Sequence, residues 1–228
     1  MKNFIEKEQS MTHFRFAALL SLISVFTLGS CIGLQADLSI RKNGSGVMNL
    51  EYRVSKMAES LGRLDGNERW QTIPAGRADF ERTMERLPGL RMVSFSSKND
   101  GADIINRVRL AFDHTGALIP FLAGTGQGAS FTEAEGKKQL TLILYPGVPD
   151  ADPELLALVR EISRTYRVSL SFSAPGATEL AFTDGAGRPL AAPEGVELRR
   201  RGKTAAFSID TGELLCSPEG LGLVFSWL

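Results

Sequence analysis

The sequence is poor in the residues that most often build catalytic and metal sites. Its 228 residues include only two cysteines and two histidines. A histidine-activated nucleophile, or a metal site that uses histidine, would have to use His114, the one histidine beyond the first thirty residues. The chain also has no CxxC, HExxH, GxSxG or phosphate-binding-loop motif. We therefore predict no catalytic, metal-binding or cofactor site.

Two further absences concern charge and long apolar runs. The chain has 26 basic and 26 acidic residues, a balance that gives no electrostatic footprint for nucleic acid or anionic lipid. A membrane-spanning helix needs about 20 apolar residues. The apolar run at residues 16–28 has only 13, and it follows the basic Arg15. Its length and position are those of a cleaved signal peptide.

The run ends in Leu28-Gly29-Ser30-Cys31. This stretch resembles the lipobox of bacterial lipoproteins, in the relaxed form found in spirochaetes. The resemblance implies removal of residues 1–30 and attachment of lipid, palmitate included, to Cys31. It also implies a place in the bacterial cell envelope, anchored to the inner or outer membrane with the domain in the periplasm. The alternative is an ordinary secretory signal with a chance cysteine.

Residues 31–228 are long enough for one domain with a core of its own. Met11 begins a leader of the same form as Met1, so both are candidate starts. With Cys31 lipidated, Cys216 has no cysteine partner within the chain. A leftover thiol in an exported protein is consistent with a reactive or intermolecular role. Its position after Leu214-Leu215 favours packing as a small apolar residue.

Hydrophobic periodicity predicts an α+β fold, with an antiparallel, hairpin-rich sheet and two or three helices packed on one face. Asn43-Gly44 and Asn99-Asp100-Gly101 are the hairpin signals. The predicted helices span residues 55–61, 77–87, 116–123 and 153–166. The predicted strands span residues 36–40, 47–54, 92–97, 104–112, 130–132, 139–145, 168–173, 178–182, 196–200, 204–209 and 221–228.

Several polar clusters have the composition of functional sites, but their context favours turns and solvated surfaces. His114 lies in a predicted turn at a strand end. The pairs Asp100–Asp103 and Glu133–Glu135 would have to face each other across a cleft to act as glycosidase carboxylates. Asp65-Gly66-Asn67-Glu68 is too sparse in oxygen ligands for a calcium loop.

Two other motifs are also better explained by local structure. Gly124, Gly126 and Ala129 match a dinucleotide-binding pattern, but such a site needs a strand before the glycines and a helix after them. A helix is predicted before them and a strand after, so we interpret the segment as a connection. Arg199-Arg200-Arg201, with Lys203, flanks a predicted hairpin tip and is interpreted as a solvated turn rather than a phosphate site.

The first predicted hairpin carries a family resemblance. Its sequence is Ala36-Asp37-Leu38-Ser39-Ile40-Arg41-Lys42-Asn43-Gly44-Ser45-Gly46. This stretch resembles the start of the LppM-like domain of bacterial lipoproteins. The resemblance implies an α+β fold that opens with this hairpin, a cell-envelope role and binding of lipid. It implies no catalytic residue.

Together these features predict a lipid-anchored lipoprotein that acts as a non-catalytic binding or structural module, with the membrane and other proteins as partners. The alternative is a carrier of lipid or another apolar ligand, held between helix 153–166 and strands that contain Leu140, Leu142 and Leu144. An enzyme of unrecognised type, using His114 or the acidic pairs, is the third hypothesis. Neither a cofactor nor a nucleic-acid partner is predicted.

Overall fold

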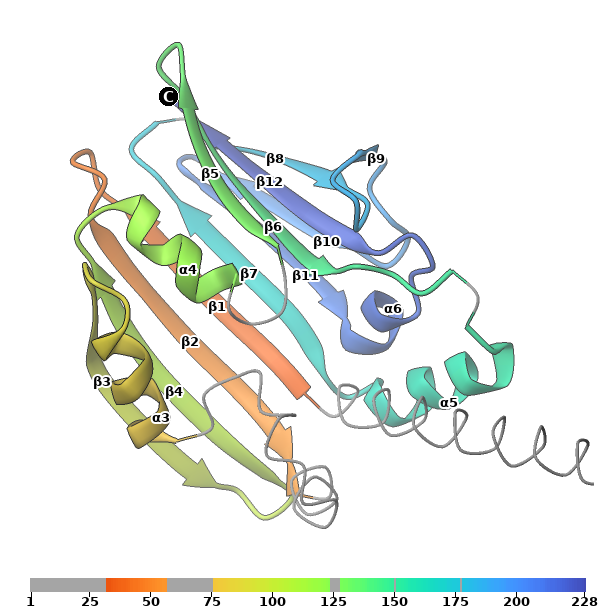
Figure 1. The fold of residues 1–228 in the computed structure, drawn as a ribbon. Helices are drawn as coiled ribbons and strands as arrows, with labels where there is room; N and C mark the ends of the chain where they lie inside the picture. The colour runs from red at the N-terminus through yellow and green to blue at the C-terminus, as the bar shows by residue number, and fades with distance from the viewer. Residues whose placement is uncertain (1–31, 57–75, 124–127, 150, 177) are drawn as a thin grey trace, which may run out of the picture.

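The computed structural model of the protein describes residues 32–228, with gaps at 57–75, 124–127, 150 and 177 (Figure 1). The predicted leader and Cys31 lie outside the described residues. So do Gly124, Gly126, the Asp65–Glu68 segment and all but the first two residues of the predicted helix at 55–61. None of the helices within the described ranges has the length and apolar character of a membrane span.

The strands form two sheets. Sheet A contains β1 (Ile32–Ile40), β2 (Gly46–Ser55), β3 (Leu90–Asn99), β4 (Asp103–Phe112), β7 (Arg167–Ser173), β10 (Glu197–Arg201) and β11 (Thr204–Asp210). Their order across the sheet is β10-β11-β7-β1-β2-β4-β3. Sheet B contains β5 (Ala129–Ala134), β6 (Lys137–Tyr145), β8 (Thr178–Thr183), β9 (Pro189–Leu190) and β12 (Leu221–Trp227). Their order is β5-β6-β12-β8-β9.

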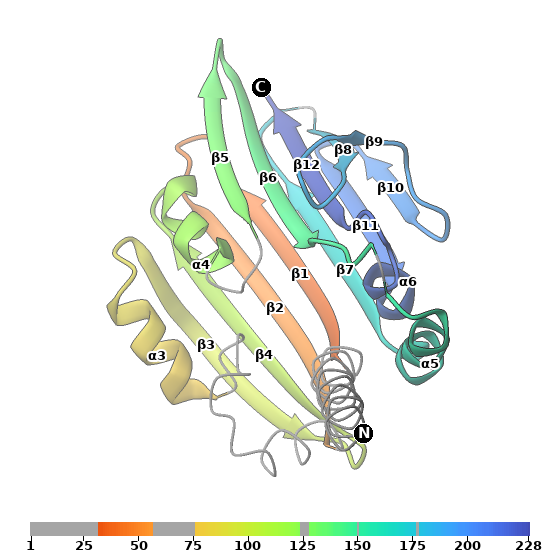
Figure 2. The same ribbon diagram turned by 45° about the vertical axis from the view of Figure 1, so that its right-hand side comes forward.

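Helices and sheet B share one face of sheet A. The described helices are α3 (Arg77–Glu85), the 3-10 helix η2 (Thr115–Leu118), α4 (Ile119–Ala123), α5 (Pro153–Ser163) and α6 (Thr211–Leu215). α3 and α4 lie beside β1 to β4 of sheet A, whereas sheet B stacks over β7 and β11 (Figures 1 and 2). α5 and α6 pack on each other at one end of the sheets. One face of sheet A is thus covered from β11 to β3, whereas the edge strand β10 is exposed at every residue.

Aromatic side chains join these layers. Between the sheets, the ring centroids of Phe172 and Phe225 are 4.7 Å apart, and those of Phe182 and Phe207 are 6.0 Å apart. Under α3, the fully buried Phe80 contacts the ring of Tyr52 on β2. Burial of such large apolar side chains is the main favourable term in folding. The core therefore lies entirely on one side of sheet A.

The α+β class and the local hairpins are confirmed. β1 and β2 pair antiparallel through the turn at Asn43-Gly44, where Gly44 has a φ of 81°. β3 and β4 pair through the turn at Asp100-Gly101. The prediction of a single sheet differs from the structure in one respect, since the strands divide into two sheets that share a core. β1 also pairs parallel with β7, which follows it by more than 100 residues. Local periodicity carries no information about such distant pairing.

The helices agree with the predictions apart from their ends. α5 begins at the predicted Pro153, and its N-cap Asp152 accepts a hydrogen bond from the Glu154 amide at 2.8 Å. It ends at Ser163 rather than at Tyr166, whose amide donates to the Ser163 carbonyl before β7 begins. The predicted helix at 116–123 is divided into η2 and α4. The five-residue α6 had not been predicted.

Candidate functional site

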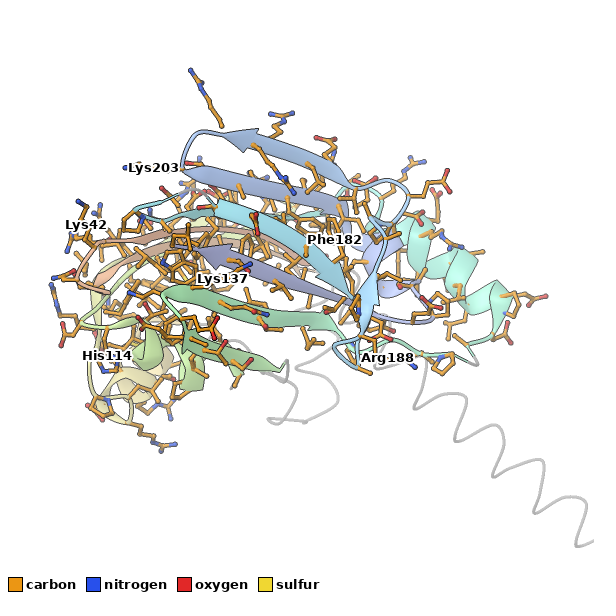
Figure 3. All side chains as sticks on the ribbon, turned by 90° about the horizontal axis from the view of Figure 1, so that it is seen from above. Lys42, His114, Lys137, Phe182, Arg188 and Lys203 are labelled. Carbon is orange, nitrogen blue, oxygen red and sulfur yellow. The ribbon has the colours of Figure 1, made fainter. Side chains whose placement is uncertain are left out.

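The residues with catalytic potential lie in turns or in the strands next to them. His114 is exposed and precedes η2 as its N-cap residue (Figure 3). Asp100 accepts a hydrogen bond from the Asp103 amide, and Asp103 accepts one from the Tyr166 hydroxyl at 2.9 Å. Asp100 thus takes part in the β3–β4 turn, whereas Asp103 begins β4 and is bound to a distant residue. In the parts of the chain that the structure describes, no group of three or more histidine, cysteine, aspartate or glutamate residues could hold a metal ion.

The other singled-out residues also have structural surroundings. Glu133 forms an ion pair with Lys138 across the β5–β6 hairpin, at 3.5 Å, while the exposed Glu135 lies in the turn. Ala129 starts β5, so a strand follows the glycine-rich segment as predicted. Arg199, Arg200 and Arg201 end β10 and Lys203 lies in the turn before β11, so the basic run flanks the hairpin tip as predicted.

Cys216 packs as a small apolar residue. It is 5% exposed and lies against Leu155 and Val159 of α5, and its thiol donates to the Leu156 carbonyl at 3.4 Å. Burial raises the pKa of this thiol, with Glu213 adding to the effect and Arg160 opposing it. A buried thiol with a raised pKa is a poor nucleophile.

The apolar lining that the carrier hypothesis requires is divided between two clusters. Leu140 is fully buried in the core between the sheets, where Leu144 also lies. The buried residues of α5 belong instead to a separate cluster around Cys216. A ligand site between α5 and these strands therefore has no support in the packing.

The face of sheet A that no described helix or strand covers is largely polar, because most of its strands alternate between buried apolar and outward polar residues. In β7, Val168, Leu170 and Phe172 are buried, whereas Ser169 and Ser171 are only half-buried. β1 follows the same rule, with Leu38 in the core and Asp37 on the other side. Successive side chains of a strand point to opposite faces, so one face is apolar and the other carries the polar residues.

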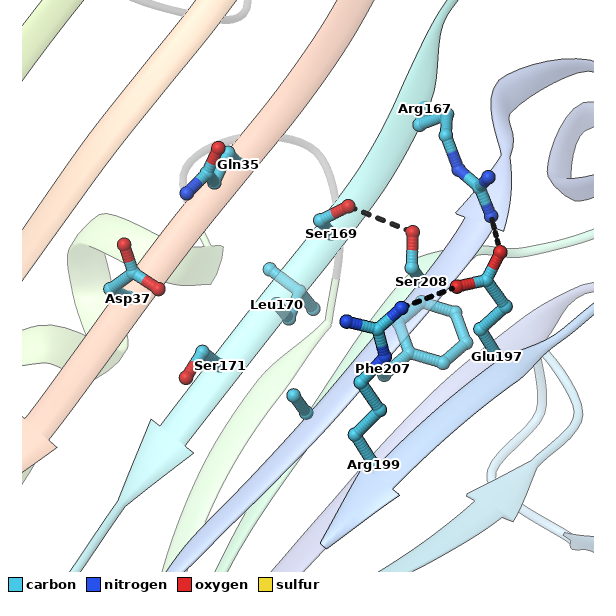
Figure 4. Close-up of a pocket in the computed structure, with 11 residues that line it drawn as sticks. Gln35, Asp37, Arg167, Ser169, Leu170, Ser171, Glu197, Arg199, Phe207 and Ser208 are labelled. Atoms are coloured by element: carbon cyan, nitrogen blue, oxygen red, sulfur yellow. Dashed lines mark hydrogen bonds and ion pairs between the residues drawn. The ribbon is translucent and has the colours of Figure 1, made fainter. Parts of the chain in front are cut away.

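This face is hollowed in two adjoining places that share Gln35 and Asp37 of β1. The first hollow, of about 290 Å³, extends over β7, β11 and β10 (Figure 4). Its further outward side chains are Arg167, Ser169, Ser171, Glu197, Arg199 and Ser208, together with the small Ala206. The apolar residues that also line it, Leu170 and Phe207, have their side chains in the core.

The second hollow, of about 420 Å³, extends from β1 over β2, β4 and β3. Its further outward side chains are Asn49, Glu51, Ser94, Ser96, Arg107 and Arg109. We call the outward side chains of the two hollows the polar face. Because the hollows share residues of the central strand β1, the polar face is continuous across all seven strands of sheet A.

Ion pairs neutralise most charges of the polar face. Glu51 accepts from Arg107 at 2.7 Å and from Arg53 at 3.4 Å. Glu197 is paired with Arg167 at 2.9 Å and with Arg199 at 3.5 Å (Figure 4). The hydroxyl groups of Ser169 and Ser208 share a hydrogen bond at 2.8 Å. These contacts hold the side chains in place at both ends of the surface.

Three residues in the middle of the polar face are unpaired. Asp37, Asn49 and Arg109 lie in one row across β1, β2 and β4, because Asp37 is in register with Asn49 and Asn49 with Arg109. None of the three forms an ion pair or a side-chain hydrogen bond with any other described residue. A row of solvent-accessible polar groups on a fixed sheet can bind a polar ligand without losing internal contacts.

The sequence contained the pattern of this site but not its location. Polar residues at every second position, such as Ser169 and Ser171, indicate one open face in each strand. Which open faces join depends on strand order. The row joins Asp37 to Arg109, which are 72 residues apart in the sequence.

Comparisons with known proteins add little. No protein-family model matches the sequence, and no curated protein matches it. Among solved structures, the NMR structure of the folded domain of LppM from Mycobacterium tuberculosis has a TM-score of 0.44 and 12% sequence identity. The alignment covers 86% of this chain and 89% of that domain.

Proposed function

We propose that this protein is a lipid-anchored lipoprotein of the bacterial cell envelope, with its domain in the periplasm, and that the domain is a non-catalytic binding module. The lipobox-like Leu28-Gly29-Ser30-Cys31 carries the proposal of an anchor. Ile32, the next residue, already begins β1. An anchor on Cys31 would therefore be joined to the domain without a linker.

The place of β1 in the fold supports a binding role close to the membrane. β1 is a central strand of sheet A, paired with β2 on one side and β7 on the other. Gln35 and Asp37, which both hollows share, lie three and five residues after Ile32. At about 3.3 Å per residue, they are roughly 10 and 16 Å along the strand from its start. The polar face would thus lie next to the bilayer surface.

The two cysteines of the chain allow a matched test of the anchor. The protein and its Cys31→Ala and Cys216→Ala variants are expressed in a bacterium that is supplied with an alkyne-bearing palmitate. We expect the label, and recovery with the membrane fraction, in the wild type and in Cys216→Ala. Cys31→Ala should be unlabelled and should leave that fraction. Equal labelling of Cys31→Ala and the wild type would overturn the anchor.

Non-catalytic binding is tested separately on the polar face. The substitutions Asp37→Ala and Arg109→Ala remove its unpaired charged groups and leave the ion pairs of Glu51 and Glu197 in place. They should abolish complementation of a deletion strain, whereas variants of His114 and the Glu133–Glu135 pair should complement it. Loss of complementation by His114→Ala in a folded protein would favour the enzyme hypothesis instead.

A further inference from the structure

The polar face lacks the side chains on which several classes of ligand depend. Among its described outward residues, Ala206 is the only apolar one, so no large apolar side chain points outward to hold a lipid chain. The central part of a protein–protein interface is also usually aromatic or aliphatic. The polar face carries four arginines and three carboxylates, an excess of one positive charge. This small excess, mostly in internal ion pairs, does not favour a polyanion such as nucleic acid.

What the polar face does present is a dense set of hydrogen-bonding groups. Serine hydroxyls on β3, β7 and β11 both donate and accept, as do the amides of Gln35 and Asn49. The unpaired row adds an acceptor in Asp37 and a donor in Arg109, on either side of Asn49. A ligand rich in hydroxyl and amide groups would match this set.

The shape of the polar face favours a chain over a small molecule. The two hollows are open and adjoin at β1, so that they form one shallow groove across seven strands. Neighbouring strands lie about 4.8 Å apart, which makes the groove roughly 29 Å long from β10 to β3. Its side chains are carried by paired strands rather than by loops, so little freedom is lost when an extended ligand binds.

We propose that the polar face binds an extended glycan strand of amino sugars, as found in the bacterial cell wall; the proposal rests on the envelope role above. Acetamido N–H groups of the sugars donate to the Asp37 carboxylate, and sugar hydroxyls exchange hydrogen bonds with Asn49 and the serines. Arg109 donates to carboxylates on the glycan, since a guanidinium matches a carboxylate in geometry and charge. The domain thereby connects the membrane to the wall.

Co-sedimentation with purified peptidoglycan sacculi tests this, using the full lipoprotein in detergent. We expect the wild type to sediment with the sacculi. Asp37→Ala, Asn49→Ala and Arg109→Ala should each bind about tenfold more weakly, since each removes hydrogen bonds to the ligand. Gln139→Ala and Glu179→Ala, on the outer face of sheet B, are matched controls and should bind as the wild type does.

Enzymatic treatment of the sacculi identifies the part that is bound. Both enzymes dissolve the sacculi, so binding of the released material to immobilised lipoprotein is measured instead. The glycan strands that an amidase frees from their stem peptides should still bind, whereas the short fragments that a muramidase leaves should not. Loss of binding on amidase treatment would overturn the proposal, and so would equal binding by the three variants or no binding by the wild type. If the wild type does not bind but Cys31 is labelled with palmitate, the glycan proposal fails while the anchor stands.

Discussion

At the residue scale, glycines determine how closely the loops at one junction approach. A Cβ atom on Gly185 would lie 2.1 Å from the carbonyl oxygen of Pro146, and one on Gly220 would lie 2.4 Å from that of Tyr145. Both obstacles are backbone atoms, which cannot rotate away. These glycines allow the end of β6, the β8–β9 turn and the segment before β12 to pack backbone against backbone.

Gly185→Ala is therefore expected to lower the free energy of unfolding by about 2–3 kcal/mol, because the junction has to open to make room for a methyl group. Gly33→Ala is the control, since its Cβ atom would meet the Tyr166 ring at an ordinary 3.5 Å. Chemical denaturation measures both. Equal stability of the two variants would contradict the close approach at Gly185.

A second prediction at this scale concerns Asp184, whose carboxylate is buried in the β8–β9 turn. It accepts hydrogen bonds from the amides of Arg188 and Ala186, each at 2.9 Å, and from Nε of Arg188 at 2.6 Å. These contacts, led by the Arg188 amide, hold the pKa of Asp184 below its usual 3.8. The ionised form therefore stabilises the fold above pH 3.8, and this stabilisation is lost as the pH falls through the folded-state pKa.

Asp184→Asn should accordingly have a lower Tm than the wild type at pH 7, by roughly 5 °C. The difference should shrink when both proteins are melted at successively lower pH below 3.8, where the wild-type carboxylate becomes protonated. Thermal melts followed by circular dichroism give both curves. A difference that stays constant over this range would show that ionisation of Asp184 contributes nothing.

At the scale of elements, Phe172 of β7 joins the two sheets. Its ring lies 4.7 Å from that of Phe225 and 5.0 Å from that of Trp227, both on β12, and it is 1% exposed. Phe172→Ala should lower the free energy of unfolding by about 4 kcal/mol, and it should reduce the near-ultraviolet dichroism of Trp227. The control is Leu158→Ala on α5, where the side chain is 49% exposed and the expected cost is below about 1 kcal/mol. If the two variants lost similar amounts of unfolding free energy, the contact of the sheets at Phe172 would not be important for stability.

The elements also mark where prediction from sequence succeeds. The hairpin β1–β2 follows from Asn43-Gly44 and from local alternation, and α5 follows from its apolar periodicity and Asp152 cap. The division into two sheets does not follow. Strands such as β7 and β12 are adjacent in neither sequence nor sheet, and their packing depends on aromatic contacts between layers. The polar face was missed for the same reason, because it requires the strand order of sheet A.

At the scale of the whole molecule, the start of β1 and the β1–β2 turn lie at opposite ends of sheet A (Figure 1). Lys98 is level with Gly33 through its pairing with Ile105, so it lies at the end where the anchor would be attached. Lys42 is in the turn at the other end. Gly33 and Ile40 are about 23 Å apart along the strand, which gives the domain a near and a far end relative to the membrane.

This orientation predicts a difference in energy transfer. A donor dye on Lys98→Cys should transfer efficiently to acceptor lipids in a vesicle that carries the lipoprotein, and a dye on Lys42→Cys should transfer much less. Both positions are exposed, whereas the native Cys216 is buried and should stay unlabelled. Insertion of a twenty-residue Gly/Ser linker between Cys31 and Ile32 should remove the difference, because a flexible tether lets the domain turn freely. Equal transfer from both sites without the linker would show that the domain is not held upright at the membrane, and the polar face would then not be kept at a fixed distance from it.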